Sequence, residues 1–497
     1  MSGEGARGGA SAGAAAGLAA VAAMYVVALV GGIRSLPELL QQPILAVMPG
    51  PLFGFLIDTL QHAGKVVEEV GLVLAMVLGL AALGAAAGLL DARRSFPHAG
   101  LVAGAAAWLV VMLVVLPVAG EGVLGLAEGV TAPLVWAVVF AVYGLLWDAL
   151  RSRSRPEAVD TGRRRVLALV PAGVALGSLA VVGYVRAPSW LRDVFSPPES
   201  GLSGRVPEIT PVENFYVVSK NFQDPVISTS SWALRVMGLV ERPLRLDYRA
   251  LQALPSSTET VTLECVSNNV GGELMSTGRF TGVPLRDLLV MAGPRPAAAG
   301  VAMKARDGYV ENLNLRLAME SPEILVAYTL GGRALPEKHG FPARMLIPGR
   351  YGMRGPKWLE EIELTESESG GYWEAQGWDH QAIVRTTARF DVPDDGAILR
   401  SRAVELGGVA FAGARGVQEV EWSADGGRTW SAAELRAPLS PLTWVLWQAV
   451  WTPPGEGAYT LVVRARDGGG ELQTAQVAPS FPSGATGYHT IRVNVGR

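Results

Sequence analysis

Cys265 is the residue whose type and setting best suit chemistry, because it is the only cysteine among 497 residues. It ends an alternating segment, residues 261–265, and precedes a polar turn, residues 266–272, that could expose its sulfur. A thiolate in such a place can act as a nucleophile or as a metal ligand. The alternative is a small buried apolar residue, the usual state of a free cysteine. A single cysteine excludes a disulfide framework and metal sites built from paired cysteines.

A nucleophilic cysteine would need a histidine as its base. The chain after residue 187 contains only His339, His380 and His489. None of these histidines stands in a sequence context typical of a cysteine protease. A cysteine protease is therefore a weak interpretation, while metal ligation and a buried apolar role for Cys265 both stay open.

Short strands must position this cysteine, since residues 232–237 and 261–265 both alternate polar and apolar side chains. Residues 284–292 carry leucine and alanine at helical spacing, so we predict an α+β domain over residues 208–380. Residues 381–497 instead show short alternating segments separated by turn residues. That pattern predicts a two-sheet β-sandwich of the immunoglobulin type, without the pair of cysteines found in antibody domains.

The first 187 residues predict an all-α transmembrane bundle, in a chain with 49% hydrophobic and only 18% charged residues. Their alanines and glycines favour close helix packing in lipid. Residues 40–60 are apolar but interrupted by prolines, which favours an interfacial or re-entrant segment. Residues 188–207 are predicted to form a linker. Five apolar runs approach the ~20 residues that a membrane-spanning helix needs, at residues 14–33, 70–90, 99–119, 131–150 and 166–185.

Charge predicts the orientation of the bundle and excludes one class of partner. Arginines cluster at residues 93–94 and between residues 151 and 165, and the positive-inside rule assigns both loops to the cytoplasm. The N-terminus is then inside, and everything after residue 186 lies on the outer side of the cell membrane. The formal net charge of -3 gives no basic surface for binding nucleic acid.

Several motifs follow one another between residues 208 and 495. They are Thr210-Pro211-Val212-Glu213-Asn214-Phe215-Tyr216, Thr262-Leu263-Glu264-Cys265-Val266-Ser267-Asn268, Leu335-Pro336-Glu337-Lys338-His339-Gly340-Phe341-Pro342, Pro348-Gly349-Arg350-Tyr351-Gly352, Lys357-Trp358 and Asp425-Gly426-Gly427-Arg428-Thr429-Trp430. In combination they resemble the sulfite oxidase family of molybdopterin-dependent oxidoreductases. Such a resemblance implies a molybdopterin domain followed by a second, immunoglobulin-like domain.

The resemblance implies a molybdenum cofactor with a single pterin and with Cys265 as the only protein ligand of the metal. The catalytic residues that it implies are Cys265, Tyr328, Arg415 and Lys220. The cofactor contacts that it implies include forked or ammonium donors for the pterin phosphate. These contacts are Asn221, Cys265, Ser267, Asn268, His339, Arg344, Gly349, Tyr351, Gly352, Arg354 and Lys357.

Two departures from the family pattern bear on the substrate. Val270 and Lys220 stand where arginines of sulfite oxidases would bind the substrate anion. Valine cannot pair with sulfite, and lysine lacks the planar fork that matches an oxyanion. We therefore expect two-electron oxygen-atom transfer on a small sulfur or nitrogen oxide, or a related oxyanion, with molybdenum cycling between Mo(VI) and Mo(IV).

The electron carrier and the export route are also expectations. The first 187 residues contain only His62 and His98, both outside the predicted spans, so we expect no intrinsic haem and an external quinone or redox protein as carrier. Members of such a family often dimerise through the sandwich domain, so a homodimer is expected. Arg163 and Arg164 precede the last apolar run and resemble a twin-arginine export signal.

Two other classes of protein compete with the enzyme. The first is a membrane-anchored extracytoplasmic binding module, which would use the β-sandwich for partner recognition and keep the cofactor fold empty. The second is a transporter with an outer sensory domain. The apolar runs show no paired broken helices and few charges, which disfavours transport.

Overall fold

The computed structural model describes two compact units, one helical and one rich in β-strands. The predicted fifth span, most of residues 40–60, Arg163, Arg164 and nearly all of the predicted linker lie outside the described residues. The described residues are 2–31, 63–94, 98–118, 132–152, 206–221, 224–400 and 402–496, with isolated positions at 35–37, 39–40, 44, 48, 52, 56 and 124.

Among its described residues, the helical unit contains four helices that are long and apolar enough to cross a membrane. Their apolar spans are Gly8–Val27, Val67–Ala92, Ala99–Val118 and Ala132–Arg151. These confirm four of the predicted helices, although the first begins earlier than expected. The helices are α1 (Ser2–Gly31), α4 (Ala63–Arg94), α5 (Ala99–Val110) with its continuation through a π-helical turn (Val111–Val115) and α6 (Leu116–Val118), and α7 (Ala132–Ser152).

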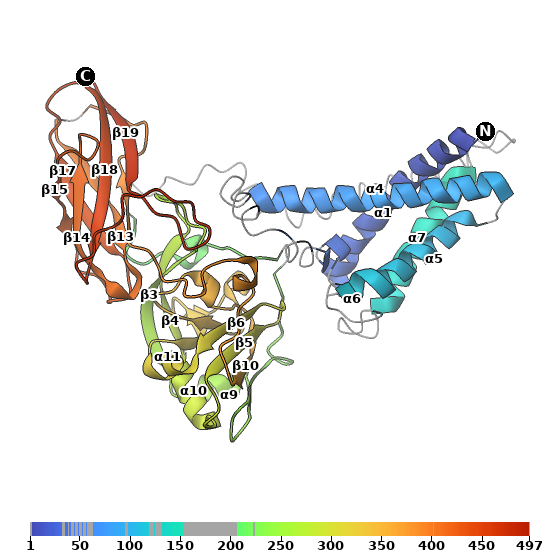
Figure 1. The fold of residues 1–497 in the computed structure, drawn as a ribbon, viewed down its shortest axis with the longest axis horizontal. Coiled ribbons are helices and arrows are strands. Elements are labelled where there is room, and N and C mark those ends of the chain that lie inside the picture. Colours follow the sequence, from blue (N-terminus) through green and yellow to red (C-terminus); the bar gives the residue numbers. More distant parts are fainter. Residues whose placement is uncertain are drawn as a thin grey trace. The chain divides into compact units, whose positions relative to one another are not determined.

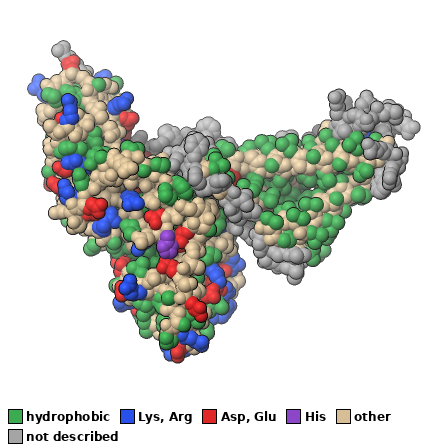
Figure 2. Space-filling view, viewed as in Figure 1, with side chains coloured by type: hydrophobic (Ala, Val, Ile, Leu, Met, Phe, Trp, Pro, Cys, Tyr) green, Lys and Arg blue, Asp and Glu red, His purple; other side chains and the backbone are tan. Residues whose placement is uncertain are grey.

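Small residues bring these helices together, as the sequence predicts. Helix α1 packs on α4, and α5 packs on α7 (Figure 1). A Cβ atom on Gly84 would lie 2.7 Å from the Cα of Gly13, and one on Gly100 would lie 2.3 Å from the carbonyl oxygen of Gly144. Hydrophobic side chains dominate the visible surface of this unit (Figure 2). This surface suits contact with lipid.

The β-rich unit begins with two sheets whose strands interleave in sequence. The first sheet has the order β2-β1-β10-β5-β6, and the second has the order β3-β4-β7-β8, with β9 paired to β7. Strand β1 runs parallel to β10, while the other pairings of these two sheets are antiparallel. The strands are β1 Ala233–Gly238, β2 Leu244–Asp247, β3 Ser257–Glu264, β4 Met275–Pro284, β5 Gly300–Ala305, β6 Val310–Asn314, β7 Leu325–Leu330, β8 Arg333–Ala334, β9 Arg344–Leu346 and β10 Leu359–Thr365.

Short helices cover these sheets, and two hydrophobic clusters fill the space between the elements. The larger cluster contains Trp232, Leu289 and Ile362, and the smaller one contains Phe215 and Phe280. The mixture of helices and strands agrees with the α+β prediction. The helices are α9 (Tyr248–Ala253), α10 (Leu285–Ala292) and α11 (Leu315–Glu320), and the 3-10 turns are Val212–Asn214, Glu337–His339, Gly352–Arg354 and Glu374–Gln376.

The rest of this unit consists of two further sheets around one core that contains Trp447, Leu461 and Ile491. One sheet has the order β11-β13-β17-β16 and the other the order β12-β19-β18-β14-β15. A two-sheet arrangement was expected, and its immunoglobulin type stays a prediction. The strands are β11 Thr387–Val392, β12 Ile398–Leu399, β13 Val404–Phe411, β14 Val417–Ser423, β15 Ser431–Ala432, β16 Glu434–Leu435, β17 Val445–Trp451, β18 Gly457–Asp467 and β19 His489–Val495, and a 3-10 turn spans Gly413–Arg415.

Hydrogen bonds join this sandwich to strand β3. The backbone N–H of Thr262 donates to the carbonyl oxygen of Leu442 at 3.0 Å, and the Thr262 hydroxyl accepts from the N–H of Trp444 at 2.8 Å. The Ser440 hydroxyl donates to the carbonyl oxygen of Thr260 at 2.6 Å. The strand that leads to Cys265 is thus held by residues from the C-terminal part of the chain.

Candidate functional site

Cys265 lies immediately after β3, at the start of the turn that leads to β4. Its backbone N–H donates to the carbonyl oxygen of Leu274 at 2.9 Å, and its sulfur lies 3.0 Å from the hydroxyl of Ser267. The cysteine is 8% exposed, and burial raises the pKa of its thiol. A thiolate at neutral pH would therefore need a cation, such as a metal, beside the sulfur.

The turn after Cys265 is closed by the side chain of Asn268. The amide nitrogen of Asn268 donates to Glu264 Oε1 at 2.9 Å, and its oxygen accepts from the backbone N–H of Leu274 at 2.9 Å. This asparagine therefore fixes the shape of the turn. Glu264 is buried, and desolvation raises the pKa of its carboxyl to about 7.

Two tyrosines and a glycine lie close to the sulfur. The charge of Cys265 interacts with the phenols of Tyr216 and Tyr351, and burial raises the pKa of each phenol. A Cβ atom on Gly352 would lie 2.8 Å from the Tyr216 hydroxyl and 3.4 Å from the carbonyl oxygen of Glu264. The loop that contains Tyr351 and Gly352 thus lies against the end of β3.

A second group of predicted residues forms a buried cationic cluster. Arg344 begins β9 and is 7% exposed, while His339 ends a 3-10 turn and is 2% exposed. Burial, and then the charges of Arg344, Lys338 and Lys357, lower the pKa of His339 to about 3. The histidine is therefore neutral at physiological pH. Phe215 packs against its ring at a centroid distance of 5.4 Å.

Polar atoms of this cluster lack partners within the described residues. Neither Nε of Arg344 nor Nε2 of His339 has a hydrogen-bond partner there. The only side-chain hydrogen bond described for Arg344 runs from Nη1 to the carbonyl oxygen of His339 at 3.4 Å. Buried polar atoms are normally paired, and a buried cation is normally compensated. An anionic ligand with several acceptors, such as a phosphate, would satisfy both residues.

Tyr216 connects the cationic cluster with the cysteine. Its phenol interacts with the charges of both Arg344 and Cys265. Its ring stacks on Phe215 at a centroid distance of 5.8 Å. The sequence motif contained both aromatic residues, but nothing in their spacing showed that they would lie between the two groups. Arg389, His489 and Glu264 are further residues near the turn that the sequence did not single out.

Other predicted residues have partners elsewhere. The Lys220 ammonium donates to the carbonyl oxygen of Asp307 at 2.9 Å and to Asn221 Oδ1 at 3.0 Å, and Asn221 donates to the Asp307 carboxylate at 2.9 Å. Lys357 donates to the carbonyl oxygens of Val218 and Lys338. These lysines and the asparagine thus serve to connect loops of the domain.

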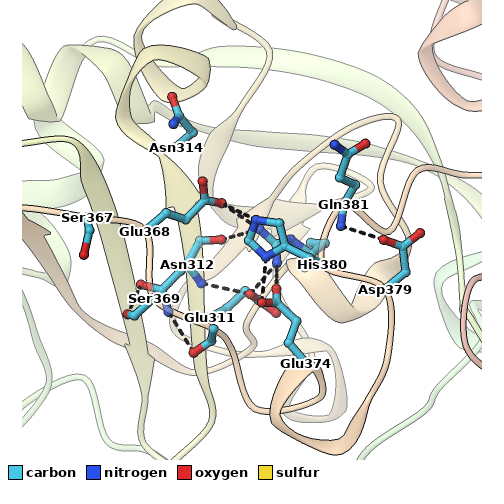
Figure 3. A network of polar contacts seen from close by, with 12 residues as sticks. Glu311, Asn312, Asn314, Ser367, Glu368, Ser369, Glu374, Asp379, His380 and Gln381 are labelled. Atoms are coloured by element: carbon cyan, nitrogen blue, oxygen red, sulfur yellow. Dashed lines mark hydrogen bonds and ion pairs between the residues drawn. The ribbon is translucent and has the colours of Figure 1, made fainter.

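The Arg354 side chain pairs with carboxylates of a polar network. Figure 3 shows Glu311, Glu368, Glu374 and His380 of this network. The guanidinium of Arg354 pairs with Glu311 at 2.7 Å and also contacts Glu374. His380 in turn contacts Glu374 at 2.7 Å and Glu368 at 3.2 Å. Desolvation raises the pKa of Glu311 to about 8. The predicted role of Arg354 as a cofactor contact is not supported by any contact in this network.

The two remaining predicted residues also lie apart from the sulfur in the contacts described. Tyr328 belongs to the larger hydrophobic cluster, where it is 6% exposed. Arg415 pairs with Asp467 at 2.7 Å and donates to the Thr386 hydroxyl at 3.0 Å. Its neighbour Ala414 packs on Gly349, where a Cβ atom would lie 2.8 Å from the alanine side chain.

Comparisons with known proteins agree with this geometry. Residues 221–373 match the family of oxidoreductase molybdopterin binding domains. Mitochondrial sulfite oxidase of Mus musculus is 30% identical over 318 residues, which cover 54% of this chain and 58% of that protein. NADH nitrate reductase of Solanum lycopersicum is 30% identical over 289 residues, which cover 47% of this chain and 32% of that protein. The chain thus spans less than two thirds of the length of these relatives.

A solved structure shows the same fold. The sulfane dehydrogenase SoxCD from Paracoccus pantotrophus superimposes with a TM-score of 0.52 at 20% sequence identity. The match covers 57% of this chain and 81% of that chain. At this level of identity the likeness concerns the fold alone.

Proposed function

We propose that this chain is a member of the sulfite oxidase family of molybdopterin oxidoreductases, which the match of residues 221–373 and the similarity to sulfite oxidases support, and that it transfers an oxygen atom to or from a small sulfur or nitrogen oxide or oxyanion. In this proposal Cys265 is the protein ligand of molybdenum. The observation that carries the proposal is the buried pair Arg344 and His339, whose polar atoms Nε and Nε2 lack partners among the described residues. Tyr216 connects this pair with Cys265.

The residues present suit a molybdenum cofactor with a single pterin. Arg344 offers a planar fork for a phosphate, and neutral His339 offers Nε2 for a hydrogen bond to the pterin. Gly352 packs closely against Tyr216 and the end of β3, where a Cβ atom would lie 2.8 Å from the Tyr216 hydroxyl. Within the described residues, no group of three or more His, Cys, Asp or Glu side chains could hold a metal ion. Cys265 would therefore be a single soft ligand rather than part of a cluster.

The cofactor, when bound, would supply the two-electron redox chemistry and the exchange of the oxygen atom. The protein would hold the sulfur as a thiolate, because coordination offsets the burial that otherwise raises the thiol pKa. The buried phenols of Tyr216 and Tyr351 would exclude water from the sulfur and keep the local dielectric constant low. No residue is required to act as a general base.

The substrate class rests on Val270 and Lys220. The ammonium of Lys220 is 3.5 Å from the Asp307 carboxylate and has two further hydrogen bonds. Its charge is therefore largely balanced inside the domain, and Val270 offers no charge. Both features favour a substrate that carries less charge than sulfite, such as a sulfoxide or another sulfur or nitrogen oxide.

The four apolar helices are consistent with membrane anchoring. We propose further that the β-rich unit lies outside the cytoplasm and passes its electrons to a quinone or a redox protein. The orientation follows from the loop arginines. We also retain as proposals the absence of an intrinsic haem and a homodimer formed through the sandwich.

One experiment tests the reaction and the metal ligand together. Molybdenum and pterin content, sulfoxide and nitrate reduction, and sulfite oxidation are measured for the wild-type chain and for Cys265→Ser. We expect the wild type to contain molybdenum and to reduce an oxide faster than it oxidises sulfite. Because loss of a metal ligand exceeds the 10- to 100-fold effect of outer contacts, Cys265→Ser should lose about 100-fold or more in turnover while retaining pterin.

Ser267→Ala is the matched control, since it removes only the hydroxyl 3.0 Å from the sulfur. We expect this control to lose about 10-fold or less. A wild-type chain without molybdenum would overturn the proposal in favour of an empty binding module. Full activity of Cys265→Ser would exclude the ligand role, and fast sulfite turnover would remove the argument from Val270.

A further inference from the structure

Two side chains of the sandwich reach the turn that follows Cys265. We propose that Arg389 of β11 and His489 of β19 are positioning residues, which hold Gly271 and Gly272 and thereby fix Cys265 for its role as ligand. This inference rests on the proposed function. It assigns to the sandwich a part in building the site, in addition to any part in dimerisation.

Arg389 holds the turn through the carbonyl oxygen of Gly272. The guanidinium of Arg389 donates from Nη1 to the carbonyl oxygen of Gly272 and from Nε to Asp391 at 2.9 Å. The side chain is only 9% exposed, so water competes little for these bonds. The backbone of Arg389 is itself fixed, because its carbonyl oxygen accepts from the indole N–H of Trp447 at 3.2 Å.

His489 holds the turn by contact. Its Nδ1 accepts from the backbone N–H of Phe390 at 3.0 Å, which fixes the orientation of the ring. A Cβ atom on Gly271 would lie 2.4 Å from both Cδ2 and Nε2 of this ring, so the imidazole lies directly against the glycine backbone. Burial, and then the charge of Arg389, lower the pKa of His489. The ring is therefore kept neutral, as its acceptor role requires.

The contacts from Arg389 and His489 add to a small set of hydrogen bonds described inside the turn. Asn268 closes the first part of the turn through its amide, and the N–H of Gly272 donates to the carbonyl oxygen of Asn269 at 2.8 Å. Gly271 has φ 78°, a conformation that favours glycine. Two adjacent glycines lose much entropy when ordered. Contacts from Arg389 and His489 restrain them before any substrate binds.

The single cysteine permits a direct test, because a thiol reagent can modify no other cysteine. Iodoacetamide alkylation of the full chain, prepared without cofactor, reports how often the turn opens to expose the buried sulfur. We expect His489→Ala and Arg389→Ala each to raise the alkylation rate by about tenfold, since each removes a restraint on local opening. His489→Asn keeps an acceptor for the N–H of Phe390 but lacks the ring atoms that contact Gly271, so its alkylation rate should stay close to that of His489→Ala.

Arg436→Gln is the matched control. It removes an ion pair between the sandwich and Glu208, at 2.8 Å, that does not involve the turn, and we expect its alkylation rate to equal that of the wild type. Thermal unfolding identifies variants that fail to fold. If the His489 or Arg389 variants fail to fold, Gly271→Ala is measured in their place, because its added methyl group pushes the turn away from an intact His489 ring. Alkylation rates that do not change in any folded variant would overturn the proposal.

Measurements on the loaded enzyme separate this inference from the proposed function. The variants of Arg389 and His489 should lose turnover and change the molybdenum EPR signal, with KM altered less than kcat, because the ligand is misplaced and the substrate contacts remain. If the wild type contains no molybdenum, the proposed function fails while the alkylation result still decides whether the turn is held. An unchanged EPR signal in a folded His489→Ala enzyme would count against positioning.

Discussion

At the scale of single residues, the informative feature is Arg344, a buried cation that pairs with no carboxylate among the described residues. Arg344 is 7% exposed, and among the described residues no carboxylate lies within ion-pairing distance of it. Arg354, in contrast, is 3% exposed but pairs with Glu311 and contacts Glu374. Two buried arginines close in sequence therefore differ in purpose. Arg354 stabilises its own network, whereas Arg344 is available for an anion from outside the chain.

This difference yields a prediction about Arg344→Met. Methionine keeps much of the side-chain volume but removes an uncompensated buried charge, so the cofactor-free chain should gain about 1–3 kcal/mol in its free energy of unfolding. The same substitution should lower pterin content at least tenfold, or about 1.4 kcal/mol or more. Urea unfolding and pterin fluorescence measure the two effects.

Arg316→Met is the control, because Arg316 is exposed. This change is expected to alter stability by no more than about 0.5 kcal/mol and to leave the cofactor content unchanged. A destabilised Arg344→Met chain that retains its pterin would contradict the assignment of Arg344 to the cofactor.

At the scale of elements, the site depends on how β3 meets the loop before Gly352–Arg354. The strand β3 was predicted at residues 261–265 and is observed at Ser257–Glu264, and the helix predicted at 284–292 is observed at Leu285–Ala292. Local periodicity was sufficient for both. The contact between the end of β3 and Gly352 was not predictable from periodicity. The two lie almost ninety residues apart and meet only through tertiary packing.

Gly352→Ala tests this contact. The added methyl group would lie 2.8 Å from the hydroxyl of partly buried Tyr216 and would displace either the ring or the end of β3. Overpacking of this kind typically costs about 1–3 kcal/mol. We therefore expect a lower melting temperature and a smaller cofactor content.

The control for this prediction is Gly455→Ala, where a Cβ atom meets nothing within 4 Å. Its stability should change by no more than about 0.5 kcal/mol. Equal changes in stability and cofactor content for the two substitutions would show that the close packing at Gly352 is unimportant.

At the scale of the whole molecule, the chain combines an apolar helical unit with a β-rich unit whose surface carries mixed charges (Figure 2). A domain that receives its cofactor in the cytoplasm would have to cross the membrane in the folded state. Arg163 and Arg164 are the predicted signal for such export, and they lie outside the described residues.

We expect the double substitution Arg163→Lys and Arg164→Lys to leave the β-rich unit protected from external protease. The positive charge is kept, so only the arginine motif is lost. The matched control is Arg93→Lys with Arg94→Lys, which changes an equivalent pair in the other loop and should not affect exposure. Protease digestion of intact cells measures the outcome, and unchanged digestion of the first variant would exclude this export route.

By itself, the sequence determined that an apolar helical region precedes a β-rich one, that four of the described helices are apolar enough to span a membrane, and that the cysteine follows a strand. These features depend on local composition, periodicity and motif order, which need no knowledge of distant contacts. Tertiary structure alone decided which partners the predicted site residues have. It left Nε of Arg344 and Nε2 of His339 without partners among the described residues, directed Arg354 and Lys220 to internal carboxylates, and brought Arg389 and His489 onto the turn. Pairing of buried charges depends on residues far apart in the chain, and no local pattern encodes it.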